Sequence, residues 1–448
     1  MMSTVYLESL GCARNQVDSE FMLAKIENAG WEIIREPAKA KVIIINTCSF
    51  IESAINESID TIIELGAYKK KGQCRRVVVT GCLPERFQEK ILSALPEVDF
   101  FLGTGAFDKI VEAISIPFQQ PVCWLPDLNQ IDPNQSKFFL QESGRPTNRF
   151  SVYLKIAEGC SRHCTYCIIP KLRGRQKSAL PADILKQAAG LIKSGAREIN
   201  LVAQDTTRFG WDLAFKTSLE QLLTDLALIS NKIWIRFLYG HPQSISSGLI
   251  ETVAGHDNLC SYFDIPVQHA STPVLKLMGR DYNSKDLYSL FDKIRAAVPG
   301  AALRTTLLVG FPGETRQDFN ELLDFVTRIK FDHLGVFTYS DFDDLASHNL
   351  GNPVPLALAQ ERKDRIMACQ QEISMVNNEK YIDKTLKILV EEHPEENLYI
   401  GRSAFQAPEV DGLTYIHTEQ NTHDIQIGSF CSVKITDALE YDLIGEAQ

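Results

Sequence analysis

One short motif constrains this sequence more than any other feature: a CxxxCxxC run formed by Cys160, Cys164 and Cys167. The motif follows residues 152–157, a largely apolar run that predicts a β-strand. Three thiolates at this spacing on one loop can bind three irons of a 4Fe-4S cube and leave the fourth iron open. The alternatives are a structural zinc site or unrelated buried thiols. A closed zinc site needs four ligands, usually as two spaced pairs, and the chain has no second CxxC pair.

An iron with an open coordination position has a specific use. In radical enzymes it binds the amino and carboxylate groups of S-adenosylmethionine, and an electron from the cluster breaks a carbon–sulfur bond to give a 5'-deoxyadenosyl radical. His163 lies inside the motif and is an alternative fourth ligand, but a position beside the cluster or facing solvent fits such a loop better. The motif therefore predicts a radical-generating cluster.

A second set of three cysteines is recognised by position instead of spacing. Residues 4–10, 41–45 and 75–80 predict strands, and the cysteines that follow them are Cys12, Cys48 and Cys82. Because parallel strands end at the same edge of a sheet, we expect these thiols to gather there. Gly11 and Gly81, each directly before a cysteine, would let the backbone turn sharply. The triplet indicates either a second cluster with an open iron or ordinary buried thiols.

The fold class is α/β, and 448 residues suggest two or three domains. In the first part, residues 1–120, helical patterns at 18–29 and 51–67 alternate with the strands, which predicts a parallel sheet wrapped by helices. Residues 119–149 carry several prolines and read as a linker. The second part, residues 146–375, holds six strand candidates, too few for a closed eight-stranded barrel, so we expect an open, partial (β/α)6 barrel. The candidates are 152–157, 198–202, 233–239, 262–267, 302–309 and 333–337.

After a helical stretch at 358–377, residues 376–448 show short strands separated by glycine and proline, which predicts a small antiparallel β-barrel. The start of the chain has no signal-peptide pattern and no stretch is apolar enough to span a membrane, so we expect a cytoplasmic protein. In a reducing compartment, eleven cysteines indicate metal binding more than disulfides. The net charge of −11 argues against a protein that coats nucleic acid.

With these residues in place, the chain resembles the methylthiotransferases of the radical S-adenosylmethionine superfamily. That family combines an N-terminal domain with three separated cysteines, a CxxxCxxC radical domain and a C-terminal TRAM β-barrel. Further matching stretches are residues 198–207, 264–269 and 304–314. The chain departs from the family pattern at Ala179, where arginine is usual, and at residues 341–346. Neither departure touches a cysteine of the two triplets.

The resemblance implies two 4Fe-4S clusters, S-adenosylmethionine as cofactor, and an electron donor such as flavodoxin or ferredoxin. Cys160, Cys164 and Cys167 would bind the radical-generating cluster and act in catalysis. The N-terminal cysteines would bind an auxiliary cluster that carries the sulfur; they are Cys12, Cys48 and Cys82. One S-adenosylmethionine would methylate that sulfur, and a second would supply the radical that abstracts hydrogen from an unactivated carbon.

Five further residues are candidates for the cofactor pocket. Gln204, Asp264 and Gln268 stand at strand ends, where they could meet polar groups of the cofactor or simply satisfy local backbone. Gly310 and Gly313 belong to a turn that lacks the lysine and serine or threonine of a phosphate loop. This turn either lines the S-adenosylmethionine pocket or is only a tight turn.

The family divides into a branch that modifies isopentenylated adenosine in tRNA, called MiaB-like, and a RimO-type branch that modifies an aspartate of ribosomal protein S12. Residues 376–448 carry 14 acidic and 5 basic residues, a net charge of −9 that would repel a phosphate backbone and attract a basic protein. Residues 401–412 and 204–207 also resemble the RimO-type branch. The resemblance and the charge together imply methylthiolation of the β-carbon of that aspartate, with S12 or the small subunit as partner and no direct tRNA or membrane contact. The alternatives are the tRNA enzyme and a non-catalytic iron–sulfur protein that docks on ribosomes.

Overall fold

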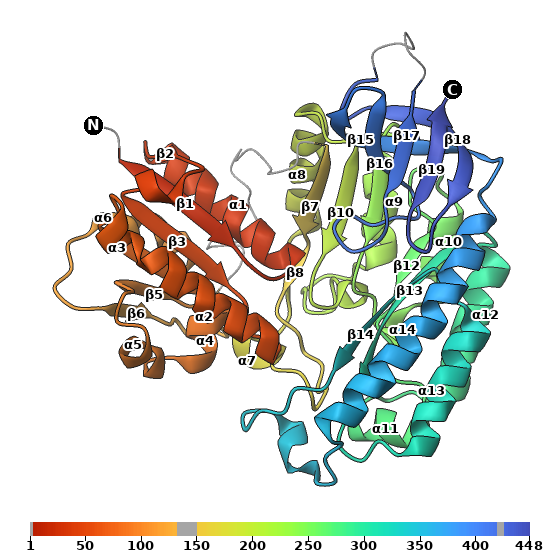
Figure 1. Ribbon diagram of the computed structural model, residues 1–448, viewed down its shortest axis with the longest axis horizontal. Coiled ribbons are helices and arrows are strands. Elements are labelled where there is room, and N and C mark those ends of the chain that lie inside the picture. The colour runs from red at the N-terminus through yellow and green to blue at the C-terminus, as the bar shows by residue number, and fades with distance from the viewer. Residues whose placement is uncertain (1–2, 132–149, 419–424) are drawn as a thin grey trace.

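The computed structural model describes residues 3–131, 150–418 and 425–448 (Figure 1). Along the chain it contains an N-terminal sheet with helices, a partial barrel and a C-terminal closed barrel. The expected domain boundary at residue 146 and most of the expected linker lie outside the described residues. Among the described helices, none is long and apolar enough to cross a membrane.

The N-terminal sheet is parallel throughout and confirms the α/β prediction. Its strand order is β2-β1-β3-β4-β5-β6. The strands are β1 (Thr4–Ser9), β2 (Glu32–Ile33), β3 (Val42–Thr47), β4 (Arg76–Gly81), β5 (Phe100–Leu102) and β6 (Val122–Trp124). The helices are α1 (Ala13–Asn28), α2 (Glu52–Gly66), α3 (Tyr68–Lys71), α4 (Cys82–Phe87), α5 (Lys90–Ala94) and α6 (Ile110–Ser115). Every residue of β3 is buried, as a central strand covered on both faces requires.

Two boundaries of this part differ from the sequence prediction. α1 begins at Ala13, whereas the sequence predicted a start at residue 18. The prediction missed the first turn because its polar residues interrupt the helical spacing of apolar residues. Asn15 and Asp18 of α1 are nevertheless buried. β6 extends the sheet beyond residue 120, and its Trp124 packs edge-on against Phe100 with ring centroids 5.6 Å apart.

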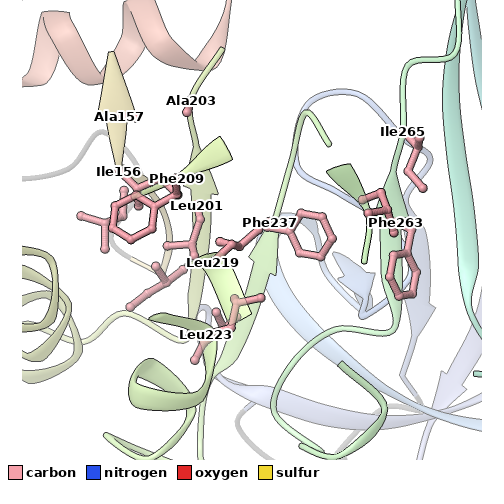
Figure 2. Packing of buried hydrophobic residues seen from close by; sticks show 14 of the residues in the cluster. Ile156, Ala157, Leu201, Ala203, Phe209, Leu219, Leu223, Phe237, Phe263 and Ile265 are labelled. Atoms are coloured by element: carbon pink, nitrogen blue, oxygen red, sulfur yellow. The ribbon is translucent and has the colours of Figure 1, made fainter. Parts of the chain in front are cut away.

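The middle part is the expected open, partial barrel. Two three-stranded parallel sheets, β11-β10-β7 and β12-β13-β14, meet at a parallel bridge between Ile235 and Leu259. The six strands are β7 (Ser151–Lys155), β10 (Glu198–Val202), β11 (Trp234–Phe237), β12 (Tyr262–Asp264), β13 (Ala302–Val309) and β14 (His333–Thr338). A small antiparallel pair, β8 (Ala157–Glu158) and β9 (Lys177–Ser178), lies beside them. Figure 2 shows Leu201, Phe237 and Phe263 of three strands packed into one apolar core.

The helices of this part are α7 (Ile169–Arg173), α8 (Pro181–Lys193), α9 (Leu219–Ala227), α10 (Ser247–Ala254), α11 (Thr272–Leu277), α12 (Ser284–Ala297), α13 (Arg316–Ile329) and α14 (Leu356–Glu379). Most of them cover the outer side of the partial barrel (Figure 1), whereas α7 lies next to α4 of the N-terminal part. α14 continues past the expected domain boundary at residue 375. It packs against β14 and α13, so it belongs structurally to the partial barrel up to its last turn.

The C-terminal part is a closed five-stranded barrel in the order β15-β16-β17-β19-β18. Its strands are β15 (Thr385–Glu395), β16 (Leu398–Ser403), β17 (Thr414–His417), β18 (Phe430–Ala438) and β19 (Leu443–Ala447). The sequence predicted an antiparallel barrel, but one pair differs: β17 and β19 are parallel. Strand directions cannot alternate all the way round a ring with an odd number of strands, so at least one neighbouring pair must be parallel.

Buried ion pairs fix this barrel to the partial barrel. Glu198 of β10 accepts hydrogen bonds from Arg236 at 2.8 Å and from Arg402 of β16 at 2.6 Å. Arg402 also donates to Glu391 of β15 at 2.6 Å. Burial raises the pKa of Glu198, but Arg402 and Arg236 outweigh that effect and lower it to about 2. The Glu198 carboxylate thus links Arg236 of the partial barrel to Arg402 of the closed barrel.

We predict that Glu198→Gln destabilises the protein by about 3–5 kcal/mol at pH 7, because it leaves two buried arginines without their shared anion. In the wild type, the lowered pKa contributes stability at pH values above about 4.5, and this contribution is lost as the pH falls towards 2. The variant should lack this part of the pH dependence. Urea unfolding between pH 2 and 7 measures both effects. The exposed Glu392→Gln is the control, and equal unfolding midpoints for the two variants would contradict the prediction.

Candidate active site

All six cysteines of the two predicted triplets line one cavity of about 810 Å³. The N-terminal sheet supplies one side of this cavity, and the partial barrel supplies the other. The cysteines are Cys12, Cys48, Cys82, Cys160, Cys164 and Cys167. The sequence placed each triplet at the end of strands, but only the fold brings the two triplets to the same space.

The N-terminal cysteines lie where parallel strands give way to helices, as expected. Cys12 immediately precedes α1, and Cys82 is the first residue of α4. Gly81 has a φ of +96°, and a Cβ atom there would lie 2.4 Å from Asn46 Oδ1, so only glycine fits. Cys48 is held by Ser58, which accepts a hydrogen bond from its backbone nitrogen at 3.2 Å and donates to its carbonyl at 2.9 Å.

The CxxxCxxC loop follows β8 and is anchored at several points by backbone hydrogen bonds. The Cys160 nitrogen donates to Gly174 O at 3.0 Å, and the Thr165 nitrogen donates to Met278 O at 3.1 Å. His163 is exposed and lines an outer pocket that shares Arg162, Cys164 and His241 with the cavity, in agreement with the solvent-facing alternative. The loop therefore presents its three thiols to the cavity and its histidine to the outside.

The two triplets of thiols lie around the cavity, and thiolates of this number are the ligands that hold three irons of a 4Fe-4S cube. In the described parts of the chain, no group of three His, Cys, Asp or Glu side chains is placed to hold a single metal ion. Burial raises the pKa of Cys48 and of Cys167, each to about 12, so these thiols would release protons when they bind a metal.

A buried network of charges joins the N-terminal sheet to the partial barrel beside the cavity. Lys155 of β7 donates to Asp18 of α1 at 2.5 Å and to Glu158 at 2.8 Å. Arg173 of α7 donates to Asp18 at 2.6 Å and to Asn15 at 2.6 Å, and it lies 3.5 Å from the sulfur of Cys82. Burial alone raises the pKa of Glu158, but Lys155 and Arg173 lower it to about 2. The network fixes α1, and with it Cys12, against the loop that carries Cys160.

The structure separates the five predicted cofactor-pocket residues into two groups. Gln204 and Gln268 line the cavity, and Gln204 Nε2 donates to Glu158 Oε1 at 2.7 Å. Asp264 is buried outside the lining and accepts hydrogen bonds from the Tyr239 nitrogen at 2.8 Å and Arg304 at 3.1 Å. Gly310 and Gly313 also lie outside the lining. A Cβ atom on Gly310 would approach Ala359 of α14 to 2.4 Å, so helix packing explains that glycine.

Several lining residues were missed by sequence reasoning. They are Arg14, Phe50, Tyr166, Arg173, Tyr239, His241, Arg280, Thr306 and Phe337. Tyr239 and His241 follow β11, so the rule that ligands bind at the carboxyl ends of parallel strands would have found them. Arg280 comes from the segment after α11, and no sequence pattern links that segment to the cysteines.

Comparisons with known proteins agree with this geometry. Residues 4–103 match the family model described as Uncharacterized protein family UPF0004, residues 154–326 match the Radical SAM superfamily, and residues 382–447 match the TRAM domain. The ribosomal protein uS12 methylthiotransferase RimO of Desulfosudis oleivorans is 50% identical over 99% of this chain and 100% of its own length. The protein of the same name from Clostridioides difficile is 44% identical over 99% of both chains. The chain belongs to the RimO-type radical SAM methylthiotransferases.

Membership of this family establishes a radical SAM enzyme with S-adenosylmethionine and iron–sulfur cofactors. Solved structures support the fold alone. TsrM from Kitasatospora setae, a radical S-adenosylmethionine methyltransferase with cobalamin and a [4Fe-4S] cluster bound, matches with a TM-score of 0.56 at 14% identity. That match covers 78% of this chain and 77% of TsrM. The cobalamin-dependent enzyme OxsB matches with a TM-score of 0.50 at 14% identity, over 83% of this chain and 56% of OxsB.

We predict that Asp18→Asn weakens the junction between the two sides of the cavity. The change leaves Lys155 and Arg173 buried with one carboxylate fewer, which should cost about 3–5 kcal/mol. Urea unfolding measures the loss, and hydrogen exchange of α1 and α7 should become faster than in the wild type. Glu27→Gln, at an exposed position of the same helix, is the control. Unchanged exchange in both helices would show that the network does not hold the domains together.

Proposed function

We propose that this enzyme adds a methylthio group to the β-carbon of an aspartate in ribosomal protein uS12 and uses two 4Fe-4S clusters to do so. One observation carries the proposal: two triplets of cysteines from separate domains line the same cavity. The relatives reported above are named for uS12, so the tRNA-modifying alternative is not favoured. A radical SAM enzyme of this family is also not the inert docking protein that was the other alternative.

In this proposal the radical-generating cluster is bound by Cys160, Cys164 and Cys167. The auxiliary cluster is bound by Cys12, Cys48 and Cys82. When bound, these groups supply the electron that cleaves S-adenosylmethionine and the sulfur that is transferred. All six thiols are free in the structure and available as ligands.

Other residues of the chain would hold the reacting groups in place. The network around Arg173 fixes the distance between the two cluster sites, since it ties α1 to the loop that carries Cys160. Gln204 is oriented by its hydrogen bond to Glu158. Phe50 and Phe337 line the cavity while 42% and 46% exposed, so they suit contacts with apolar parts of an entering protein loop.

An acidic hairpin of the C-terminal barrel supports a basic protein as substrate. Glu392, Glu395 and Glu396 are exposed near the turn between β15 and β16. The net charge of −9 overstates the free charge of this barrel, because Asp411 pairs at 3.3 Å with Arg304 of the partial barrel, a cation outside residues 376–448. Glu419 and Asp424 lie outside the described residues. The exposed hairpin acids would attract a basic ribosomal protein and speed its encounter.

The direct test is a reaction of the anaerobically reconstituted enzyme with uS12, or the small ribosomal subunit, and separately with isopentenylated tRNA. Mass spectrometry should find the methylthio group on the aspartate of uS12 and none on tRNA. The reverse result would overturn the proposal. Reduced flavodoxin and ferredoxin, which we propose as electron donors, can be compared in the same assay. A cytoplasmic location would follow from a ribosomal substrate and stays a prediction.

We predict separate roles for the two cysteine triplets. The reconstituted wild type should hold about eight irons, four for each cubane. Replacing Cys160, Cys164 and Cys167 with alanine should remove half of the iron and abolish 5'-deoxyadenosine formation. Replacing the N-terminal triplet should remove the other half and abolish methylthiolated product, while reductive cleavage of S-adenosylmethionine continues. Iron analysis and product chromatography measure both. The matched control is Cys260→Ala, a buried cysteine outside the cavity, and product formation without the N-terminal triplet would refute the sulfur assignment.

We also predict that the acidic hairpin governs association with uS12. Changing Glu392, Glu395 and Glu396 to lysine should slow association more than it speeds dissociation, because peripheral charges act on encounter. The wild-type rate should fall as salt is raised, since screening at 0.15 M acts over about 8 Å. Surface plasmon resonance measures both rates. The control reverses three exposed acids elsewhere, Glu27, Glu32 and Glu321, and an equal slowing there would refute a specific role of the hairpin.

A further inference from the structure

Arg280 is a buried cation in the wall of the cavity. It is only 7% exposed, and its Nη2 donates a hydrogen bond to the hydroxyl of Tyr166. Its other two guanidinium nitrogens, Nε and Nη1, are buried without a hydrogen-bond partner in the described structure. A buried donor without an acceptor costs free energy, and this cost is greater for a charged group. The described residues satisfy this guanidinium only in part, through the hydrogen bond to Tyr166 and cation–π contacts with the rings of Tyr166 and Tyr282.

Two other arginines of the cavity show what Arg280 lacks, whereas Arg14, which also lines the cavity, donates to Ala203 O at 3.1 Å and has no ion pair among the described residues. Arg162 and Arg173 line the same cavity, and each pairs with a carboxylate at less than 3 Å: Arg162 with Asp205 at 2.8 Å, and Arg173 with Asp18 at 2.6 Å. Within the described residues no ion pair is found for Arg280. The ionisable side chains that act most strongly on the pKa of Arg280 are Tyr166, Tyr282 and Cys164, and none of them is a carboxylate. An anion from outside the chain would complete this site.

The surroundings of Arg280 favour an anion near the CxxxCxxC loop. Tyr166 lies between Cys164 and Cys167 in the motif, so its hydrogen bond holds the guanidinium beside this loop. His241, which also lines the cavity, has its pKa lowered by burial and by the neighbouring Arg280, Arg162 and Arg208. Its imidazole is therefore neutral and adds no charge. No carboxylate of the described residues compensates the charge of Arg280, which lies beside the loop that would bind the radical-generating cluster.

We propose that Arg280 binds a carboxylate group in this cavity. A guanidinium presents a planar fork of N–H groups that matches the two oxygens of a carboxylate. This inference rests on the proposed function, in which two ligands carry that group: S-adenosylmethionine through its methionyl carboxylate, and uS12 through the side chain of the target aspartate. Arg280 is in either case a binding residue that fixes the orientation of a reactant.

The test uses the full-length, anaerobically reconstituted enzyme and the variants Arg280→Gln and Arg280→Lys. Equilibrium binding is measured for S-adenosylmethionine and for its decarboxylated analogue, and for uS12 with the target aspartate intact or changed to alanine. Iron content and the electron paramagnetic resonance spectrum of the reduced clusters show whether each variant has folded and loaded. Arg208→Gln is the matched control, because Arg208 also lies near His241 but lines only the outer pocket.

We expect Arg280→Gln to keep its iron and to bind one of the two carboxylate ligands about ten- to a hundredfold more weakly, as the loss of a charged hydrogen bond implies. For that ligand the variant should discriminate less than the wild type between the form with and the form without the carboxylate. Loss of discrimination for S-adenosylmethionine assigns the cofactor carboxylate, and loss for uS12 assigns the aspartate. Arg280→Lys, which keeps the charge but not the fork, should be intermediate.

Two outcomes overturn the inference. If Arg280→Gln distinguishes the two forms of each ligand as well as the wild type does, Arg280 binds neither carboxylate and only balances the charge of the cluster. If Arg208→Gln weakens binding equally, a general positive potential is responsible and not a direct contact. Both differ from failure of the proposed function, which would show as absence of methylthiolated uS12 with the wild-type enzyme itself.

Discussion

Four buried charges between α1 and the first strands of the partial barrel hold the candidate active site together. Asp18 receives hydrogen bonds from both Lys155 and Arg173, and Glu158 pairs with the same two cations. Two carboxylates and two cations in one enclosed place balance each other, which is the condition for burying charge without a large penalty. Since Arg173 also reaches Asn15 and the sulfur of Cys82, one network sets the position of the N-terminal cysteines relative to Cys160.

The same physical principle fixes the third domain. Glu198, the first residue of β10, forms buried ion pairs with both Arg236 and Arg402. These pairs join the closed barrel to the partial barrel. A second contact uses Asp411, which accepts a hydrogen bond from Tyr262 at 2.6 Å. Because breaking such pairs leaves uncompensated charge, the barrel is fixed in orientation and is not a loosely tethered module. Its exposed acidic hairpin then has a defined place relative to the cavity.

Sequence reasoning predicted β1, β3 and β4 of the N-terminal sheet and the six strands of the partial barrel, because buried parallel strands are continuous apolar runs. It did not predict β2, β5 and β6, which are only two or three residues long. β10 and β13 were predicted with their observed bounds. It missed the first turn of α1, where buried Asn15 looks like a surface residue, since one of its partners, Arg173, lies more than a hundred positions away. It left open whether Asp264, Gly310 and Gly313 meet the cofactor or serve the local backbone; Asp264 accepts a hydrogen bond from the Tyr239 nitrogen, and Gly310 lies against Ala359. A strand end is visible in sequence, but the direction of a side chain there is not.

The sequence by itself determined the chemical groups: two cysteine triplets, each at strand ends, and an acidic C-terminal barrel. Spacing and strand pattern suffice for that, because the ligands of one loop or one sheet edge are placed by local geometry. Only the tertiary structure decided that both triplets line one cavity, that Glu391 is bound to Arg402, and that Arg280 stands beside the CxxxCxxC loop without an anion. These facts depend on contacts between segments far apart in the chain, and such contacts leave no periodic pattern in a single sequence.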